Sequence, residues 1–246
     1  MKRIYLFICL LCMMSNAQKT TIKVLYKIIL NENSVSEKMS LMSIEQKQVY
    51  QNTNNAFKDL ALKLVSNFKL STVILETKMN TGSAMDSKFA ALKITKGRDW
   101  MYNIEDKTAL FRVNYMGENI SVSSDLYPYN WKISAETKKV NGYDCIKATT
   151  SSTYISRITN SPIVKNIDVW FAPKIPCVIA PNSLNGLPGL ALEIIYDDFA
   201  IIVEKIDFDA SDLINVDFYK IKTHFNNEAD FLLFAKNKTT EIRNRK

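Results

Sequence analysis

The C-terminal half of this chain alternates short apolar segments with turn residues, and this alternation limits the possible folds more than any other feature of the sequence. From Asp99 onward, segments typical of strands begin roughly every eight residues, a spacing typical of all-β folds. The pair Asn141-Gly142 between two of them is typical of a two-residue hairpin turn. The predicted strands are residues 100–104, 109–115, 120–126, 130–134, 143–151, 153–158, 164–171, 190–196, 200–208 and 216–222. The pattern predicts an antiparallel sheet.

The N-terminal half adds two strand patterns and one helical pattern. Residues 20–30 and 70–78 are rich in β-branched and apolar side chains, as strands are. Apolar residues then recur at helical spacing, which predicts a helix near residues 56–68 with Asn54 or Asn55 as its cap. The apolar stripe of this helix consists of Phe57, Leu60, Ala61, Leu64, Val65 and Phe68.

Three further segments complete the expected fold. A short helical piece is predicted near residues 43–50, a loop over residues 81–97, and a C-terminal helix over residues 227–243. The fold class is therefore mainly β (α+β), a strongly curved antiparallel sheet or open half-barrel of about ten strands. We expect the helix near residues 56–68 to pack on the concave face of this sheet.

The beginning of the chain has the features of a secretory signal peptide, residues 1–17. Lys2 and Arg3 form its positive start, and residues 4–14 are its apolar run. Ala17 ends a stretch of small residues that suits cleavage. We therefore expect an exported protein of the periplasm or cell envelope, with residues 18–246 as a single β-rich domain.

The charge balance of the expected mature chain is mildly basic. The full chain has 32 Lys and Arg against 25 Asp and Glu, and loss of two positive residues with the leader leaves 30 against 25, a net charge of +5. Nucleic-acid binding needs a concentrated basic face, whereas these positive residues are scattered, so no nucleic-acid partner is expected. No later segment has the roughly 20 apolar residues of a transmembrane span.

A proline-rich segment, residues 169–198, contains four of the six prolines and two of the six glycines. Within it, Pro188 followed by Gly189 suits the two central positions of a type II turn, because Gly accepts a positive φ without strain. Leu187 and Leu190 would flank the turn and anchor the next strand. The segment is predicted to be a stiff, packed strand entry, and a contact with a ligand or partner is the alternative.

Two cysteines remain after the leader, Cys145 and Cys177. Two thiols can pair in an oxidising compartment. A disulfide across this separation of 32 residues would stabilise the fold by about 3–4 kcal/mol if it acts through chain entropy. Two buried, unpaired thiols are the alternative, because a disulfide requires Cα atoms within about 7 Å of each other.

Residues suited to catalysis or to metal binding are few. His224 is the only histidine and has no nucleophile motif nearby, so no catalytic residue is predicted. The two mature cysteines form no CxxC pair, so neither a metal site nor a cofactor is expected. A calcium site is a weaker alternative, although the spacing of its carboxylates fits no EF-hand loop. These carboxylates are Asp197, Asp198, Asp207, Asp209 and Asp212.

Four motifs in the second half of the chain resemble, in order, those of the GLPGLI family of Bacteroidota envelope proteins. They are residues 129–133 with 136–138, residues 141–148, residues 169–176, and the motif Gly186, Leu187, Pro188, Gly189, Leu190. Ala191 departs from the final Ile of the family motif, and residues 178–182 depart from its glycine-containing, aromatic-rich approach. The resemblance, over about residues 98–210, implies export and a β-rich fold and supplies no activity.

These features together favour a non-catalytic envelope protein. Its curved sheet is expected to bind a hydrophobic or extended ligand, such as a lipid or another hydrophobic small molecule. The alternative is a structural or assembly partner of an outer-membrane complex, which would contact an envelope protein through residues 173–190 or an exposed strand edge. A hydrolase with an unfamiliar site ranks last, because acid–base residues are sparse.

Overall fold

The computed structural model describes residues 21–67, 69–77, 84–155 and 161–244. The predicted signal peptide, residues 1–17, lies outside them. Within the described residues the fold is mainly β, a curved and unclosed sheet of twelve strands accompanied by four helices. The predicted fold class is therefore confirmed, with two strands more than the ten expected.

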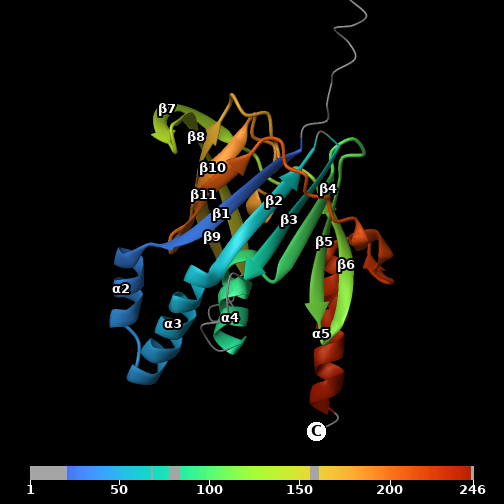
Figure 1. Ribbon diagram of the computed structural model, residues 1–246. Coiled ribbons are helices and arrows are strands. Elements are labelled where there is room, and N and C mark those ends of the chain that lie inside the picture. The colour runs from blue at the N-terminus through green and yellow to red at the C-terminus, as the bar shows by residue number, and fades with distance from the viewer. Residues whose placement is uncertain (1–20, 68, 78–83, 156–160, 245–246) are drawn as a thin grey trace, which may run out of the picture.

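The sheet is antiparallel apart from one short edge strand. Its order is β12-β6-β5-β4-β3-β2-β1-β11-β10-β9-β8-β7, and only β12 pairs in parallel, with β6. Register shifts in the pairings of β1, β7 and β10 add twist and bend to the sheet (Figure 1). The strands are β1 (Ile22–Leu30), β2 (Leu60–Ser66), β3 (Leu70–Thr77), β4 (Arg98–Asn103), β5 (Thr108–Tyr115), β6 (Glu118–Asp125), β7 (Lys132–Val140), β8 (Tyr143–Ile155), β9 (Pro162–Ala172), β10 (Leu190–Ile195), β11 (Phe199–Asp207) and β12 (Thr223–Phe225).

The predicted tight hairpin is present between β7 and β8. Asn141 and Gly142 have φ values of 49° and 84°, so both central residues are left-handed as a type I′ turn requires. Val140 pairs with Tyr143 directly across the turn. The dipeptide therefore sets the register of this edge hairpin.

Four helices extend from one end of the sheet, α2 (Glu32–Ser40), α3 (Ile44–Ala56), α4 (Ala84–Thr95) and α5 (Glu228–Asn244) (Figure 1). A capping box between Ser43 and Gln46 starts α3, and the helical piece expected near residues 43–50 is confirmed as part of it. The C-terminal helix is also confirmed. The loop predicted over residues 81–97 is wrong, because α4 lies there.

The reason for missing α4 is its burial pattern. Ala90 and Ile94 are its buried apolar residues, whereas Phe89 and Leu92 remain 47% and 45% exposed. Apolar residues on both sides of the helix erase the periodicity that a core-facing helix normally shows.

The helix predicted near residues 56–68 is wrong, because this segment forms strand β2 after the end of α3. Six of the seven residues of β2 are buried, so apolar side chains occupy both faces of the strand. Leu60 and Leu64 lie on one face and Ala61 and Val65 on the other. Their combined spacing of three and four residues imitated a helical stripe. Asn54 and Asn55, proposed as its cap, belong to the last turn of α3.

The strand predicted over residues 216–222 is also wrong. A 3-10 helix, Asp217–Lys220, occupies most of this segment, and the strand β12 follows it. Phe218 is buried by this turn of helix, and the guanidinium of Arg112 lies 5.0 Å from the centre of its ring. Packing of one aromatic side chain thus decides the local conformation.

The proline-rich segment packs into the core, but its turn differs from the predicted type II turn. The N–H of Gly189 donates to Leu187 O over 2.9 Å, whereas the N–H of Leu190 donates to Ile175 O over 3.0 Å. A three-residue turn around Pro188 therefore replaces the four-residue turn. Glycine is required at position 189 because a Cβ there would lie 2.3 Å from Ala172 O.

Candidate functional site

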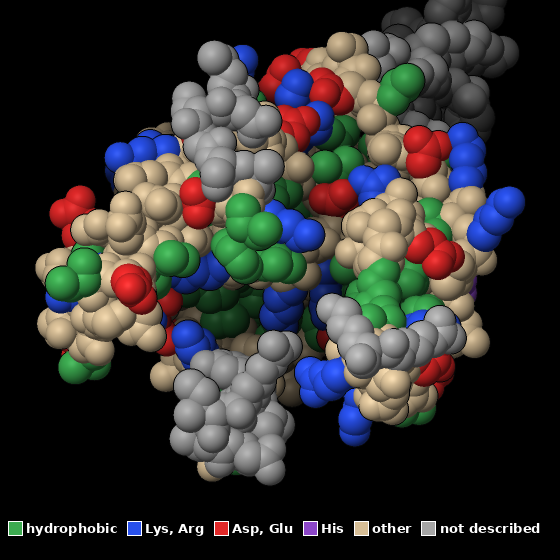
Figure 2. Space-filling view, turned by 90° about the horizontal axis from the view of Figure 1, so that it is seen from below, with side chains coloured by type: hydrophobic (Ala, Val, Ile, Leu, Met, Phe, Trp, Pro, Cys, Tyr) green, Lys and Arg blue, Asp and Glu red, His purple; other side chains and the backbone are tan. Residues whose placement is uncertain are grey.

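A cavity of about 400 Å³ lies on the concave face of the sheet. Trp100 of β4 and Ser124 of β6 line one side of it, and Ser152 of β8 and Ile167 of β9 line the other. Five strands separate β4 from β9 in the sheet order, so only the curvature brings these walls together. Seen from below, the molecule is hollowed, with apolar side chains inside and Lys and Arg side chains along the hollow (Figure 2).

Asn185 ties the proline-rich segment to the chain that crosses the cavity. Its side chain donates to Leu126 O over 3.0 Å and accepts from the N–H of Ala180 over 2.9 Å. Its carbonyl oxygen accepts from Trp131 Nε1 over 2.9 Å. These bonds hold both ends of residues 126–131, the connection from β6 to β7, and this connection brings Tyr129 to the cavity.

Four aromatic residues contribute to the cavity wall: Trp100, Tyr129, Tyr196 and Phe199. Tyr196 and Phe199 stack with ring centres 4.6 Å apart, and Asn182 Nδ2 donates to Tyr196 Oη over 2.9 Å. Burial raises the pKa of both tyrosines in the wall. Their hydroxyl groups therefore stay protonated, and the wall offers flat apolar surface with polar tips.

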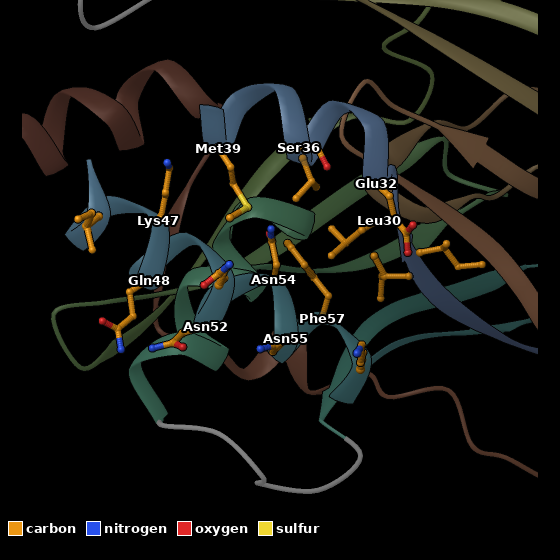
Figure 3. Close-up of a pocket in the computed structure, with 16 residues that line it drawn as sticks. Leu30, Glu32, Ser36, Met39, Lys47, Gln48, Asn52, Asn54, Asn55 and Phe57 are labelled. Carbon is orange, nitrogen blue, oxygen red and sulfur yellow. The ribbon is translucent and has the colours of Figure 1, made fainter. Parts of the chain in front are cut away.

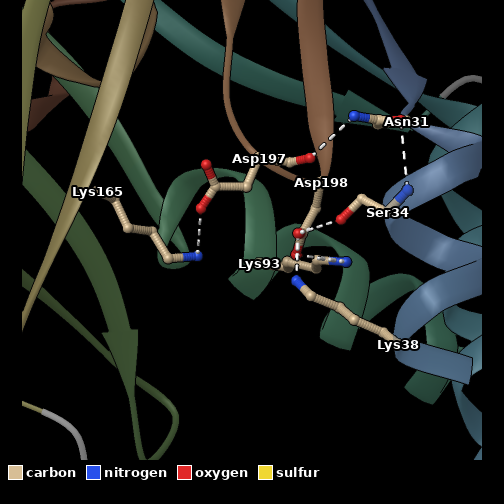
Figure 4. A network of polar contacts seen from close by, with 7 residues as sticks. All are labelled: Asn31, Ser34, Lys38, Lys93, Lys165, Asp197 and Asp198. Atoms are coloured by element: carbon tan, nitrogen blue, oxygen red, sulfur yellow. Dashed lines mark hydrogen bonds and ion pairs between the residues drawn. The ribbon is translucent and has the colours of Figure 1, made fainter. Parts of the chain in front are cut away.

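A polar network closes the end of the cavity nearest α2 (Figure 4). Asp198 accepts from Ser34 Oγ over 3.2 Å and pairs with Lys38, while Lys93 Nζ lies 3.7 Å from its other oxygen. Burial acts to raise the pKa of Asp198, but the hydrogen bond and charge of Lys38 outweigh it and the pKa is lowered. Asp197, the residue before Asp198, lies 3.5 Å from the ammonium of Lys165 on β9.

A second ion pair stands at the opposite end of the cavity. Arg98 of β4 donates to both carboxylate oxygens of Glu228 in the first turn of α5, over 3.1 and 2.5 Å. The guanidinium also lies 4.2 Å from the centre of the Phe111 ring. Burial acts to raise the pKa of Glu228, but the Arg98 contacts outweigh it and the pKa is lowered. This bidentate pair fastens α5 to the sheet.

Cys145 and Cys177 are both buried and both free. Burial is the largest cause that raises the pKa of each thiol, so the thiols are held in the unreactive protonated form. Neither cysteine lines the cavity. Their place in the structure is that of small core residues.

The family-type motif is mostly buried. Leu187 and Leu190 are 2% and 0% exposed, and only Gly186 and Pro188 reach the surface. A Cβ at Gly186 would lie 3.1 Å from the Tyr127 ring. The motif therefore packs in the core and does not line the cavity.

Four of the five carboxylates considered for calcium are engaged by other groups. Asp197 and Asp198 pair with lysines, Asp212 pairs with Lys23 over 3.0 Å, and the Asp207 side chain accepts from the N–H of Asp209. Among the described residues no group of three or more His, Cys, Asp or Glu side chains is placed to hold a metal ion.

His224 lies on the other face of the sheet. Its Nδ1 is 2.8 Å from Ser121 Oγ, and its Nε2 is 3.3 Å from Ser123 Oγ. These serines alternate along β6 with Ser124, which faces the cavity. Both ring nitrogens are thus occupied by hydroxyl groups, which joins β12 to the edge of the sheet.

A second, more open groove of about 970 Å³ lies between α2 and α3 (Figure 3). Met39 and Leu30 line it beside polar residues of α3. Asn54 is 6% exposed at its base, and neither polar atom of its side chain has a hydrogen-bond partner among the described residues. The groove is therefore an unfilled surface between two helices rather than an enclosed site.

Sequence reasoning missed the residues that give the concave cavity its charge. Lys93 and Lys96 fall in the segment predicted as a loop, and Arg98 and Glu228 come from elements far apart in the chain. The sequence suggested Asp197 and Asp198 only as possible calcium ligands. Lys93 and Lys96 are three residues apart, so their spacing would indicate a shared position in the fold only if the sequence had predicted α4.

The model of one protein family, described as "Protein of unknown function (Porph_ging)", matches residues 131–193. These residues include most of the motifs on which the resemblance to an uncharacterised Bacteroidota family rests. No curated protein matches the chain significantly. The described residues contain no helix that is both long and apolar enough to pass through a membrane.

Two solved structures, both of PNGF-II in different space groups, resemble the fold. Each is 12% identical, with TM-scores of 0.51 and 0.50, and the alignments cover 88% and 86% of this chain. They cover 32% of the PNGF-II chain, so this chain spans about a third of that protein. At this identity the likeness concerns the fold alone.

Proposed function

We propose that this chain is an exported, non-catalytic binding protein of the cell envelope, which holds a hydrophobic small molecule or lipid in the concave cavity. The observation that carries the proposal is the cavity itself, which the two sides of one curved sheet enclose and four aromatic residues wall. Its volume of about 400 Å³ is in the range of small-ligand pockets.

The ionisation of the cavity side chains favours binding over chemistry. A general acid or base works best with a pKa near the working pH. The pKa values of Asp198 and Glu228 are lowered, and those of Tyr129 and Tyr196 are raised, so these four groups move away from neutrality. Carboxylates and hydroxyl groups fixed in one protonation state suit the positioning of a ligand, and two lysines of the lining with lowered pKa values supply positive charge.

The test uses the neutral fluorescent probe N-phenylnaphthylamine with the purified protein. Ser152 faces the cavity from β8, whereas its neighbour Ser151 is exposed on the opposite face. Ser152→Phe should fill the cavity and lower probe affinity at least tenfold, while Ser151→Phe should leave it unchanged. Equal probe binding by both variants, or none by the natural protein, would contradict the proposal.

A second experiment looks for the natural ligand directly. Native mass spectrometry of protein purified gently from the envelope should show a bound organic molecule in the natural protein and none in Ser152→Phe. A ligand-free mass in the natural protein, with no uptake of added lipid, would count against this function.

A second candidate is a structural or assembly partner of an outer-membrane complex, favoured by the surface of α2 and α3. Leu41 and Ile44 are 86% and 84% exposed beside the groove, and the Asn54 amide in its base is unsatisfied. Residues 173–190, first considered for this contact, are largely packed into the core. The partner surface of this second candidate is therefore the pair of helices.

A photo-crosslinking residue tests this second candidate in intact cells. Placed at Ile44, it should capture one recurring envelope protein, and the exposed position Lys236 on α5 should not. The crosslink should disappear when Leu41→Asp is added. Capture that is unaffected by this substitution, or equal at the two positions, would reject the candidate.

A further inference from the structure

The concave cavity contains more positive than negative charge. Four cationic residues and three carboxylates line it. Each carboxylate has its own cation: Asp197 has Lys165, Glu228 has Arg98, and Asp198 has Lys38, which stands outside the lining. Lys93 and Lys96 remain as two lining cations with no carboxylate to themselves.

Lys93 shares Asp198 with Lys38 and has no hydrogen bond of its own. Its ammonium lies 3.7 Å from Asp198, too long for a hydrogen bond, and bonds to no other described atom although it is closed off from solvent. It lies 5.0 Å and 5.2 Å from the ring centres of Tyr50 and Phe57. A buried ammonium without hydrogen bonds is costly, so a ligand anion that accepts from it would be bound favourably.

Lys96 follows the last turn of α4 and lines the same cavity. The residue is exposed overall, yet partial burial of its ammonium, followed by the charge of Arg98, lowers the pKa of Lys96. It forms no ion pair within the described part of the chain. Ser183 adds a buried hydroxyl to the lining, and this residue is only 3% exposed.

Resting on the proposed binding function, we propose that the ligand is an amphipathic organic anion, with an apolar body against the aromatic wall and its negative group held by Lys93 and Lys96. The walls supply apolar surface, and the two lysines supply ammonium groups that no carboxylate of the lining hydrogen-bonds. The lysine side chain has four flexible carbons, so both ammonium groups can turn toward one ligand group. A neutral hydrophobic molecule would leave both cations unsatisfied.

The test compares two probes that share one apolar body. N-phenylnaphthylamine is neutral, and anilinonaphthalene sulfonate is the same body with a sulfonate. The natural protein should bind the sulfonate at least about tenfold more tightly, as expected for a hydrogen-bonded charge. Equal affinity would overturn the anion proposal and leave the binding function intact. Failure of both probes to bind would overturn the binding function.

Variants then assign the selectivity to the two lysines. Lys93→Gln and Lys96→Gln should each lower the affinity for the sulfonate about fivefold to tenfold and leave the affinity for the neutral probe unchanged, which also reports an intact fold. Lys88→Gln removes the same charge from an exposed position of α4 and should change neither affinity. A loss as large for Lys88→Gln as for the cavity lysines would show nonspecific charge attraction and overturn the proposal.

Competition with simple amphiphiles extends the test to natural ligand chemistry. Decanoate should displace the sulfonate probe from the natural protein, whereas decanol, with the same chain and no charge, should displace it at least tenfold less well. Equal displacement by both would contradict a requirement for the negative group.

Discussion

The indole N–H of Trp131 donates a hydrogen bond of 2.9 Å to the carbonyl oxygen of Asn185, and this bond joins the chain that crosses the cavity to the proline-rich segment in the core. Asn185 itself is fully buried and satisfies two further backbone groups with its side chain. One residue therefore connects the segment that resembles a family motif to the wall of the candidate site.

Replacing Asn185 by Ala should destabilise the protein by about 2–4 kcal/mol, because the Ala180 N–H and the Leu126 carbonyl are left buried without partners. Urea unfolding measures the change. Asn182→Gly is the control, since Gly keeps the left-handed backbone of this half-buried residue (φ 58°) and loses one bond to Tyr196, which should cost about 1 kcal/mol. Equal losses would show that the buried carboxamide has no special role.

Gly189→Ala should be among the most damaging single substitutions, with a loss of about 3 kcal/mol or more. The new Cβ would meet the backbone of residues 172 and 173 at 2.3–2.8 Å, and backbone cannot move aside as a flexible side chain can. Gly117→Ala is the matched control, because its φ of 88° is also positive but nothing lies within 4 Å of the new Cβ. Thermal unfolding should show a clearly smaller change for the control, about 1 kcal/mol.

Lys93→Met should raise the free energy of unfolding of the ligand-free protein by about 1 kcal/mol, because it keeps the apolar stem and removes an ammonium without hydrogen bonds. The same variant should bind the sulfonate probe more weakly. Opposite changes in stability and affinity are typical of a residue kept for function. Unchanged stability, measured by urea unfolding, would indicate that the ammonium is already satisfied in solution.

Acid should destabilise the protein through Asp198 and Glu228. Both pKa values are lower in the folded than in the unfolded protein, so the unfolded state binds more protons and stability rises with pH across this interval. The contribution is complete above the unfolded pKa, about 4, and is lost as pH falls through the folded values. When the free energy of unfolding is measured against pH, Asp198→Asn should reduce its slope in the acid range. Asp230→Asn, outside the cavity, should leave this slope unchanged.

Base should weaken binding of the anionic probe. The pKa values of Lys93 and Lys96 are lowered, first of all by burial, so these ammonium groups lose their protons at lower pH than an ordinary lysine does. Affinity for the sulfonate should fall as pH rises toward those values, and affinity for the neutral probe should not. The other charged groups that act on the two lysines are Lys38 of α2, Lys165 of β9, Asp198, Arg98 of β4 and Glu228 of α5. A parallel fall for both probes would point to loss of the fold instead.

Local chemistry in the sequence predicted the parts of the fold that neighbouring residues decide. Asn141-Gly142 takes the positive φ values of a type I′ turn because few other residues do so cheaply. Most strands from β4 to β11 lie near their expected positions, but β7 continues to Val140, and residues 143–151 and 153–155, expected in two separate strands, form the single strand β8. Prediction failed where burial on two faces replaced the usual pattern, as in β2, whose leucines imitate a helix, and in α4, whose apolar residues point both inward and outward.

The sequence by itself determined that this chain forms a mainly β, curved antiparallel sheet with a tightly packed Pro-Gly corner. Only the tertiary structure decided where the cavity lies and which charges enter it. Trp100 and Ile167 line one cavity because the sheet bends through five intervening strands, and Lys93 enters it because α4 packs against α3 and β4. Residues this far apart in the chain become neighbours through long-range packing, which short-range patterns do not encode.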